Sequence, residues 1–117
     1  MKKLVLVHWH PGEATLFRRE LETLGWQVFC VDRSEKTRLK PIREFQPRLF
    51  LISLSRLPSH GQAFARAVWS TAWARNIPIL FFDGSTETVT EYKRLFPDAY
   101  FCRRENIAVA IQKILEE

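Results

Sequence analysis

Five short apolar runs divide the chain, and each is followed by polar or turn-forming residues. The runs are Lys3–His8, Trp26–Asp32, Leu49–Leu54, Ile79–Phe82 and Ala99–Arg103. Nearly continuous apolar runs of this length are typical of strands that are buried on both faces of a sheet. The third run stops in a loop of Ser, Arg, Pro, His and Gly residues. It therefore predicts a central strand whose carboxyl end carries a loop of functional residues.

Segments with helical spacing of apolar residues separate these runs. In the clearest of them, which follows Pro11, Phe17 and Leu21 share one face and Gly25 is placed to end the helix. The other helices are predicted over 34–45, 61–76, 85–96 and 107–115. Pro41 is expected to kink or split the second helix, because proline lacks the backbone N–H that a helix interior needs.

Alternating strands and helices predict an α/β fold with one doubly wound parallel sheet. The chain has 117 residues, 46% of them hydrophobic, so we expect a single domain over 1–117 without an output domain. Right-handed crossovers leave few strand orders, and the flavodoxin-like order 2-1-3-4-5 is the commonest for five such units. Ligands of these sheets bind beyond the carboxyl ends of the first and third strands.

Composition narrows the class of protein further. No apolar run reaches the roughly 18–20 residues that a membrane span needs, and the first residues lack the cleavage site of a signal peptide. We therefore expect a cytoplasmic protein that does not bind membranes.

Cys30 and Cys102 are expected to be reduced thiols, because they fall on the two outer strands, about 19 Å apart. A disulfide needs Cα atoms within about 7 Å.

With this pattern, the whole chain resembles a response-regulator receiver domain of two-component signal transduction. The segments IPILFFDG and DAYFCRR are similar to the family's last two strands. Pro47 and Gly61 stand where the family has a proline before the third strand and a glycine opening the third helix. Tyr100 matches the aromatic residue that shifts on activation. Arg103 and Arg104 replace the family's lysine and proline.

The residues that would carry phosphotransfer are replaced. The resemblance places Ser53 at the phosphoacceptor aspartate, His8 and Trp9 at the acidic pair, and Asp83 at a hydroxyl residue. Receiver chemistry needs a carboxylate nucleophile and two further acids that hold magnesium. We therefore predict a pseudo-receiver that is not an enzyme and has no cofactor. Its degenerate phosphorylation pocket consists of His8, Trp9, Ser53, Asp83 and Arg103, with Arg103 binding an anion or pairing with Asp83.

The three histidines suggest a second use of the same edge. His8, His10 and His60 fall in the first and third strand-to-helix loops, which converge in this fold. Together with Asp83 they would offer nitrogen and oxygen ligands to a late transition metal, although loop histidines more often make ordinary hydrogen bonds. A catalytic triad of Ser53, His60 and Asp83 is not predicted, because the strand lacks the tight Gly-x-Ser-x-Gly turn of hydrolases.

Large aromatic residues mark a possible partner surface. Trp69 and Trp73 are one turn apart on the predicted third helix, where they either flank the core or contact a protein. The resemblance implies a second contribution from the fourth helix, fifth strand and fifth helix, which would also support a homodimer. The residues of this predicted partner surface are Trp69, Trp73, Tyr92, Phe96, Tyr100 and Arg104.

Two functions therefore remain open, besides a metal or small-anion sensor that uses the loop histidines His8, His10 and His60. The first is a stand-alone signalling or scaffolding module that binds a protein independently of phosphorylation. The second is a basic module that associates with nucleic acid, because the net charge is +5 and basic residues cluster in one segment. Those residues are Arg33, Lys36, Arg38, Lys40, Arg43 and Arg48. Salt dependence separates the two, since phosphate binding weakens steeply with ionic strength.

Overall fold

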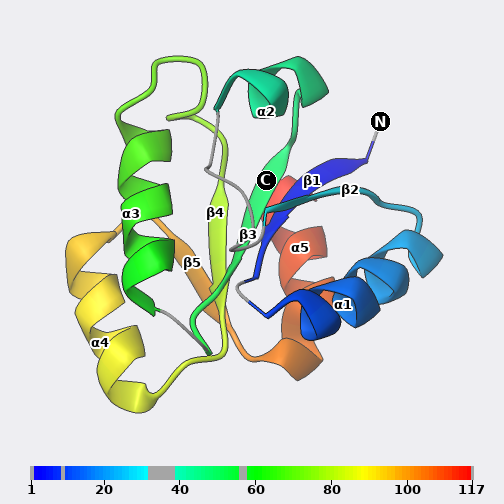
Figure 1. The fold of residues 1–117 in the computed structure, drawn as a ribbon. Coiled ribbons are helices and arrows are strands. Elements are labelled where there is room, and N and C mark those ends of the chain that lie inside the picture. The colour runs from blue at the N-terminus through cyan, green and yellow to red at the C-terminus, as the bar shows by residue number, and fades with distance from the viewer. Residues whose placement is uncertain (1, 9, 32–38, 56–57, 117) are drawn as a thin grey trace.

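The computed structural model describes residues 2–8, 10–31, 39–55 and 58–116 of the chain (Figure 1). The side chains of residues 11, 39, 58–61 and 116 lie outside this description. The strands are β1 (Lys3–Val7), β2 (Gln27–Val31), β3 (Leu49–Ser53), β4 (Ile79–Phe82) and β5 (Tyr100–Cys102). The helices are α1 (Pro11–Thr23), α2 (Leu39–Phe45), α3 (Pro58–Trp69), α4 (Thr86–Leu95) and α5 (Ile107–Glu116), with a 3-10 turn at Arg104–Asn106.

The five strands form one parallel sheet in the order β2-β1-β3-β4-β5. The predicted fold class and strand order are therefore confirmed. β3 lies at the centre, and all five of its residues are buried. Parallel strands with helices on both faces leave no side of the sheet open to water, which explains why each run is apolar throughout.

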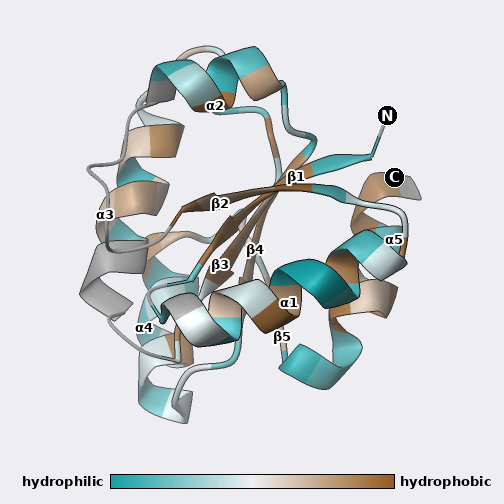
Figure 2. Ribbon diagram, turned by 45° about the vertical axis from the view of Figure 1, so that its right-hand side comes forward, coloured by the Kyte–Doolittle hydropathy of each residue, from teal (hydrophilic) through white to brown (hydrophobic). Residues whose placement is uncertain are grey.

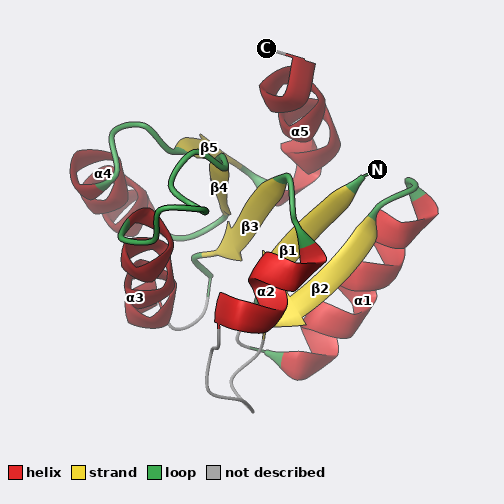
Figure 3. Cartoon of the chain, turned by 90° about the horizontal axis from the view of Figure 1, so that it is seen from above, coloured by secondary structure: helices red, strands yellow, loops and turns green. Residues whose placement is uncertain are grey.

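Alternate residues of each strand serve two separate core layers. Val5 and Val7 face the layer that α2, α3 and α4 cover, whereas Leu4 and Leu6 face the layer of α1 and α5. Figures 1 and 3 show these two groups of helices on opposite faces of the sheet. In Figure 2 the strands are largely hydrophobic, and the helices around them carry both hydrophilic and hydrophobic residues.

The third helix differs from its predicted range of 61–76. It begins at Pro58, a residue that suits the first turn, and it ends at Trp69. At its end the Thr71 hydroxyl donates to the Ala67 carbonyl, while the Thr71 N–H bonds to Val68 instead. This side-chain bond replaces the next helical backbone bond, and tight turns follow up to Ile77.

Two smaller predictions concern Pro41 and the two cysteines. That Pro41 kinks or splits the second helix stays a prediction, because residues 32–38 lie outside the described part of the chain and α2 is described only over Leu39–Phe45. Cys30 and Cys102 are free thiols on the outer strands β2 and β5, as predicted. Within the described part of the chain, no helix is long and apolar enough to cross a membrane.

Candidate functional site

The carboxyl edge of the sheet brings together three residues of the predicted pocket. His8 follows β1, Ser53 ends β3 and Asp83 follows β4, and these three strands are neighbours in the sheet. Arg103 follows the outer strand β5. Trp9, the fifth predicted member, lies outside the described residues.

His8 is held by contacts on both of its ring nitrogens. Its side chain is buried, and Nδ1 accepts the His10 N–H at 3.3 Å. Nε2 lies 3.4 Å from Glu13 Oε2. The ring also sits 6.2 Å from the rings of Phe17 and Phe82. Where a receiver has an acidic residue, this chain therefore has an imidazole with fixed partners.

His10 and Glu13 form the start of α1. The Nδ1 atom of His10 accepts the Glu13 N–H at 3.2 Å, which makes His10 the N-cap of the helix. The carboxylate of Glu13 reaches back to His8. Glu13 was not predicted as a site residue, although a polar cap followed by Glu three residues later is a known signal for a helix start.

The Ser53 hydroxyl bonds to its own loop. Its side chain is fully buried, and its oxygen lies 2.8 Å from the Ser55 hydroxyl oxygen. The Ser55 N–H also donates to Ser53 Oγ at 3.2 Å. Ser55 was not predicted as a site residue, although a hydroxyl two residues beyond a buried serine commonly closes a turn of this kind. Ser53 is thus a structural hydroxyl, with no carboxylate bonded to it in the described part of the chain.

Asp83 and Arg103 do not form the expected ion pair. The Oδ1 atom of Asp83 accepts the backbone N–H of Arg104 at 2.9 Å. The Arg103 guanidinium instead donates to the Gly84 carbonyl at 2.9 Å. The expectation that Arg103 pairs with Asp83 is wrong, because the backbone of the facing loop supplies a partner for each side chain. Both contacts tie the loop after β4 to the loop after β5.

The loop after β4 needs glycine at position 84. Gly84 has a φ of +91°, and a Cβ atom there would lie 2.7 Å from the Leu54 Cβ. The preceding Asp83 also adopts a positive φ of 60°. This turn therefore packs directly against the end of β3.

The predicted metal site is only partly described. Nδ1 of His8 and Nδ1 of His10 both accept backbone N–H groups. His60 lies in α3, but its side chain is outside the described part of the chain. Among the described residues, no group of three or more His, Cys, Asp or Glu side chains lies close enough to hold a metal ion. The histidine metal site stays a prediction.

Magnesium chemistry of the receiver type does not fit these residues. Magnesium prefers an octahedral set of oxygen ligands, several of them carboxylates. Here the ends of β1 and β3 carry an imidazole and a hydroxyl, at His8 and Ser53. Two carboxylates at this edge, Glu13 and Asp83, contact His8 and the Arg104 backbone instead.

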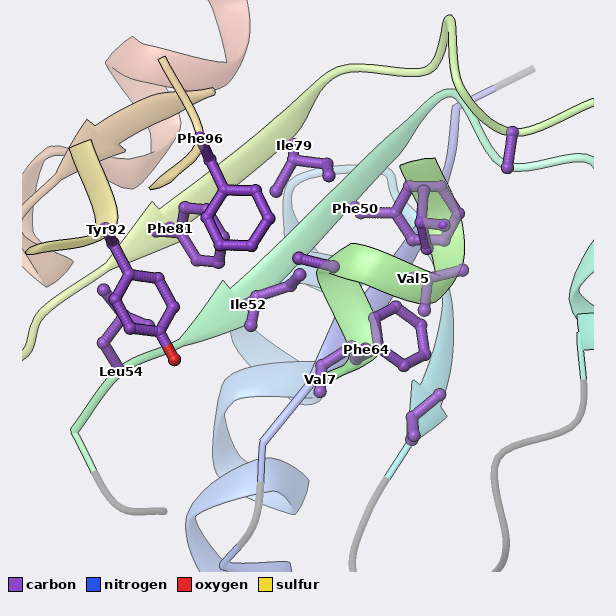
Figure 4. Packing of buried hydrophobic residues seen from close by; sticks show 14 of the residues in the cluster. Val5, Val7, Phe50, Ile52, Leu54, Phe64, Ile79, Phe81, Tyr92 and Phe96 are labelled. Carbon is purple, nitrogen blue, oxygen red and sulfur yellow. The ribbon is translucent and has the colours of Figure 1, made fainter. Parts of the chain in front are cut away.

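Two residues of the predicted partner surface belong to the core. Tyr92 and Phe96 are each only 2% exposed, because the inner face of α4 packs on Phe81 of β4. Figure 4 shows both rings lying over the sheet beside Phe81. The prediction that these two side chains are available to a partner is therefore wrong. Their helical spacing already indicated a core stripe.

The remaining members of that surface lie apart. Trp69 is half-buried and packs edge-on against Phe96, with ring centroids 4.9 Å apart. Trp73 packs partly against the same core from the turn after α3. Tyr100 is 40% exposed on β5. Arg104 is exposed, and its guanidinium lies 4.4 Å from the centroid of the Phe17 ring.

Trp69 and Tyr100 share a surface pocket of about 450 Å³. Arg75 and Asp98 line it as well, and Ile79 at the start of β4 helps to close it. We call it the Trp69–Tyr100 pocket. It lies at the amino edge of the sheet, opposite to His8 and Ser53. A pocket with aromatic walls and charges of both signs is suited to a protein side chain.

Two ionisable groups have shifted pKa values. Burial, together with the charges of Asp83 and Glu105, raises the pKa of the partly buried Cys102 thiol to about 11. Burial also raises the pKa of the Tyr92 hydroxyl, although a hydrogen bond with the Gln62 backbone opposes this shift. Cys102 is consequently a poor nucleophile, because the thiolate is the reactive form.

The basic segment of the sequence is described only in part. Lys40, Arg43 and Arg48 are exposed. Arg33, Lys36 and Arg38 lie outside the described residues. Association with nucleic acid stays a prediction.

Comparison with known proteins supports the fold. No protein-family model matches the chain, and no curated protein matches it. A solved bacteriophytochrome response regulator, RtBRR, is similar over 96% of this chain and 76% of its own, with 18% identity and a TM-score of 0.67. The signal receiver domain of a modulated diguanylate cyclase from Desulfovibrio desulfuricans G20 is similar over 100% of this chain and 99% of its own, with 22% identity and a TM-score of 0.68.

These similarities define the class of fold. The chain has the five-stranded α/β fold of response-regulator receiver domains. At this level of identity the likeness concerns the fold alone, so the function has to be argued from the residues.

Proposed function

We propose that this chain is a receiver-fold signalling or scaffolding module that binds a protein partner without being phosphorylated. The observation that carries the proposal is the state of Ser53. It stands at the carboxyl end of the central strand, fully buried, with its hydroxyl bonded to Ser55. A serine needs an adjacent base to become a nucleophile, and its bonded partner here is a second hydroxyl.

The other residues at the carboxyl edge of the sheet favour a fixed conformation of the loops rather than one that depends on phosphate. His8, Asp83 and Arg103 each bond to the protein itself, through Glu13, the Arg104 N–H and the Gly84 carbonyl. Internal contacts of this kind favour one arrangement of the loops. We infer that the module presents its binding surface constitutively, in a cytoplasmic setting.

The partner site is best assigned to the Trp69–Tyr100 pocket. Half-buried tryptophan and tyrosine side chains are the residues most often found at energetic hot spots of interfaces. Arg75 and Asp98 add charges at the rim. We propose that an apolar side chain of the partner inserts between Trp69 and Tyr100.

Phosphorylation independence can be tested with acetyl phosphate and Mg²⁺. We expect no gain of a phosphoryl mass in the intact protein, and none in Ser53→Ala. A receiver domain of known activity serves as the positive control in the same reaction. A phosphoryl adduct that Ser53→Ala abolishes would contradict the proposal.

The partner site can be tested by capture from an extract of the source cells with quantitative mass spectrometry. We expect Tyr100→Glu to lose the captured protein, because it places a charge beside the apolar walls. Leu16→Glu is the matched control, since Leu16 is 56% exposed on α1, in the opposite layer. Capture that survives Tyr100→Glu would reject this pocket. Capture that nuclease or moderate salt abolishes would favour the nucleic-acid function instead.

A further inference from the structure

A second pocket lies on the other face of the sheet, between the C-terminal end of α1 and the length of α5. Its volume is about 500 Å³, within the range of roughly 300–1,000 Å³ that holds small molecules. It opens at the amino edge of β1 and β3, away from His8 and Ser53. The lining residues that matter here are Lys2, Leu24, Trp26, Arg48, Ala108 and Leu115.

One part of the wall of this pocket is apolar, formed by Leu24, Trp26, Ala108, Ile111 and Leu115 beside the polar Gln112. Leu24 caps the end of α1 and is 53% exposed, and Leu115 lies across from it on α5. Gly25 has a φ of +95°, which turns the chain at the helix end and brings Trp26 into the wall. The Trp26 N–H bonds back to the Leu21 carbonyl at 3.1 Å. A molecule in the pocket would cover apolar surface that now faces water, which favours binding.

Two cations stand on the strand side of the same pocket. Lys2 and Arg48 come just before β1 and β3, which are adjacent strands. Their backbones are held by the sheet, since the Lys2 carbonyl accepts from Gln27 at 2.7 Å and the Arg48 N–H donates to Lys3 at 2.8 Å. The Lys2 Nζ atom lies 6.0 Å from the Trp26 ring centroid.

No negative charge offsets these cations among the described residues that line the pocket. Neither Lys2 nor Arg48 forms an ion pair with a carboxylate in the described part of the chain. Two positive charges beside apolar walls complement a ligand that has an anionic head and an apolar body. Burial of the body and pairing of the head then act together.

We propose that this pocket, the Lys2–Arg48 pocket, binds a soluble amphipathic organic anion. The ligand class is a molecule with an aromatic or aliphatic body and one carboxylate, sulfonate or phosphate group. The head pairs with Lys2 and Arg48, and the body lies against Leu24, Trp26 and Leu115. This assignment does not depend on the partner site at Trp69 and Tyr100.

The test uses 8-anilino-1-naphthalenesulfonate as the probe and N-phenyl-1-naphthylamine, its uncharged counterpart, as the control. We expect saturable binding of the sulfonate, with amide shifts at Leu24, Trp26 and Ala108 in a ¹⁵N-correlated spectrum of the folded protein. The neutral compound is expected to bind more weakly. Equal binding of both compounds, or shifts elsewhere, would overturn the proposal.

Removing the charges of Lys2 and Arg48 provides a second test of the proposal. The double variant Lys2→Gln, Arg48→Gln should bind the sulfonate about fivefold more weakly, as expected for the loss of two exposed charge pairs. Arg94→Gln removes a charge from α4, and its affinity should equal that of the unmodified protein. Unchanged affinity in the double variant would overturn the proposal.

Two further outcomes would assign the pocket to another occupant. Sedimentation of the protein with phosphatidylglycerol vesicles, but not with phosphatidylcholine vesicles, would indicate a membrane surface. Self-association that the double variant abolishes, without binding of the sulfonate, would indicate a second copy of the chain. Either result would overturn the soluble-ligand assignment.

Discussion

Gly84 lies in the loop after β4 and packs against Leu54, which follows β3. Its positive φ is one that L-residues adopt at a cost, and its missing side chain makes room for Leu54. Both constraints act at the point where the loops after β3 and β4 meet. The glycine is therefore required by the backbone and by packing at once.

Substitution at the two positive-φ glycines separates these constraints. Gly25→Ala should cost about 1 kcal/mol of unfolding free energy from backbone strain alone, because nothing lies within 4 Å of its new Cβ. Gly84→Ala should cost about 1–3 kcal/mol more, since its Cβ collides with Leu54. Urea denaturation measures both values. Equal losses would show that packing at Leu54 is not limiting.

Alkaline pH should destabilise the fold through Cys102. The folded thiol keeps its proton up to a pKa of about 11, whereas an unfolded thiol loses it near 9.0. Between these values the folded state binds more protons, so the free energy of unfolding should fall as pH rises from about 9 to about 11. Tyr92, whose pKa is also raised, acts in the same direction above pH 10.

Denaturation curves at pH 8 and pH 10.5 measure this effect. Cys102→Ser should lose less stability between the two pH values than the unmodified protein, because it removes the titrating thiol. Tyr92→Phe provides an independent check of the second group. An identical pH dependence in Cys102→Ser would show that the thiol pKa is not raised.

At the residue scale, the sequence predicts which residues meet at the carboxyl edge of the sheet, but not how they are bonded. His8, Ser53 and Asp83 could be placed because the ends of parallel strands meet at one edge. The bond from the Arg104 N–H to Asp83 joins residues 21 positions apart, and no local pattern reports such a contact. Glu13 was detectable in principle, since it stands three residues after the helix cap.

Among the elements, α4 depends on a conventional cap. Ser85 Oγ accepts the Thr88 N–H at 3.1 Å and satisfies one of the free donors of the first turn. Ser85→Ala should therefore lower the unfolding free energy by about 1 kcal/mol, and Ser85→Asp should preserve it.

Thermal and urea denaturation test this cap. Thr86→Ala is the matched control, because Thr86 is the first helical residue and is exposed. It should leave stability nearly unchanged. A comparable loss in both variants would mean that the Ser85 hydroxyl does not carry the effect.

Helix ends were the least predictable features at this scale. Phe64 and Val68, one turn apart on α3, form an apolar stripe that is buried in the core. The end of α3 could not be predicted from that stripe, because the Thr71 hydroxyl takes the Ala67 carbonyl from the backbone. Trp73 therefore lies in the turns after α3 and not on the helix. The partner surface was misjudged for a related reason, since Tyr92 and Phe96 were assigned by analogy rather than by their core spacing.

The whole molecule is built on one sheet with a core layer on each face. Neighbouring residues of the central strand, Phe50 and Leu51, belong to opposite layers. Both layers pack against the same five strands. If one layer loses its packing, the strands that support the other layer are disturbed as well. Strand order was predictable at this scale, because right-handed crossovers restrict the possible topologies.

Unfolding should accordingly be a single transition. Far-UV circular dichroism reports the helices of both layers, and tryptophan fluorescence reports Trp26 in one layer and Trp69 in the other. We expect the two signals to give the same midpoint in urea. Two separated midpoints would contradict the shared-sheet description.

The positions of the two thiols limit what oxidation can do to this protein. Cys30 and Cys102 lie on opposite margins of the sheet, four strand spacings or about 19 Å apart. No bridge can close within one molecule, so any disulfide must join different molecules. Because each molecule carries one thiol at each margin, such bonds would link copies end to end into open chains, with the slow Cys102 thiol limiting their growth.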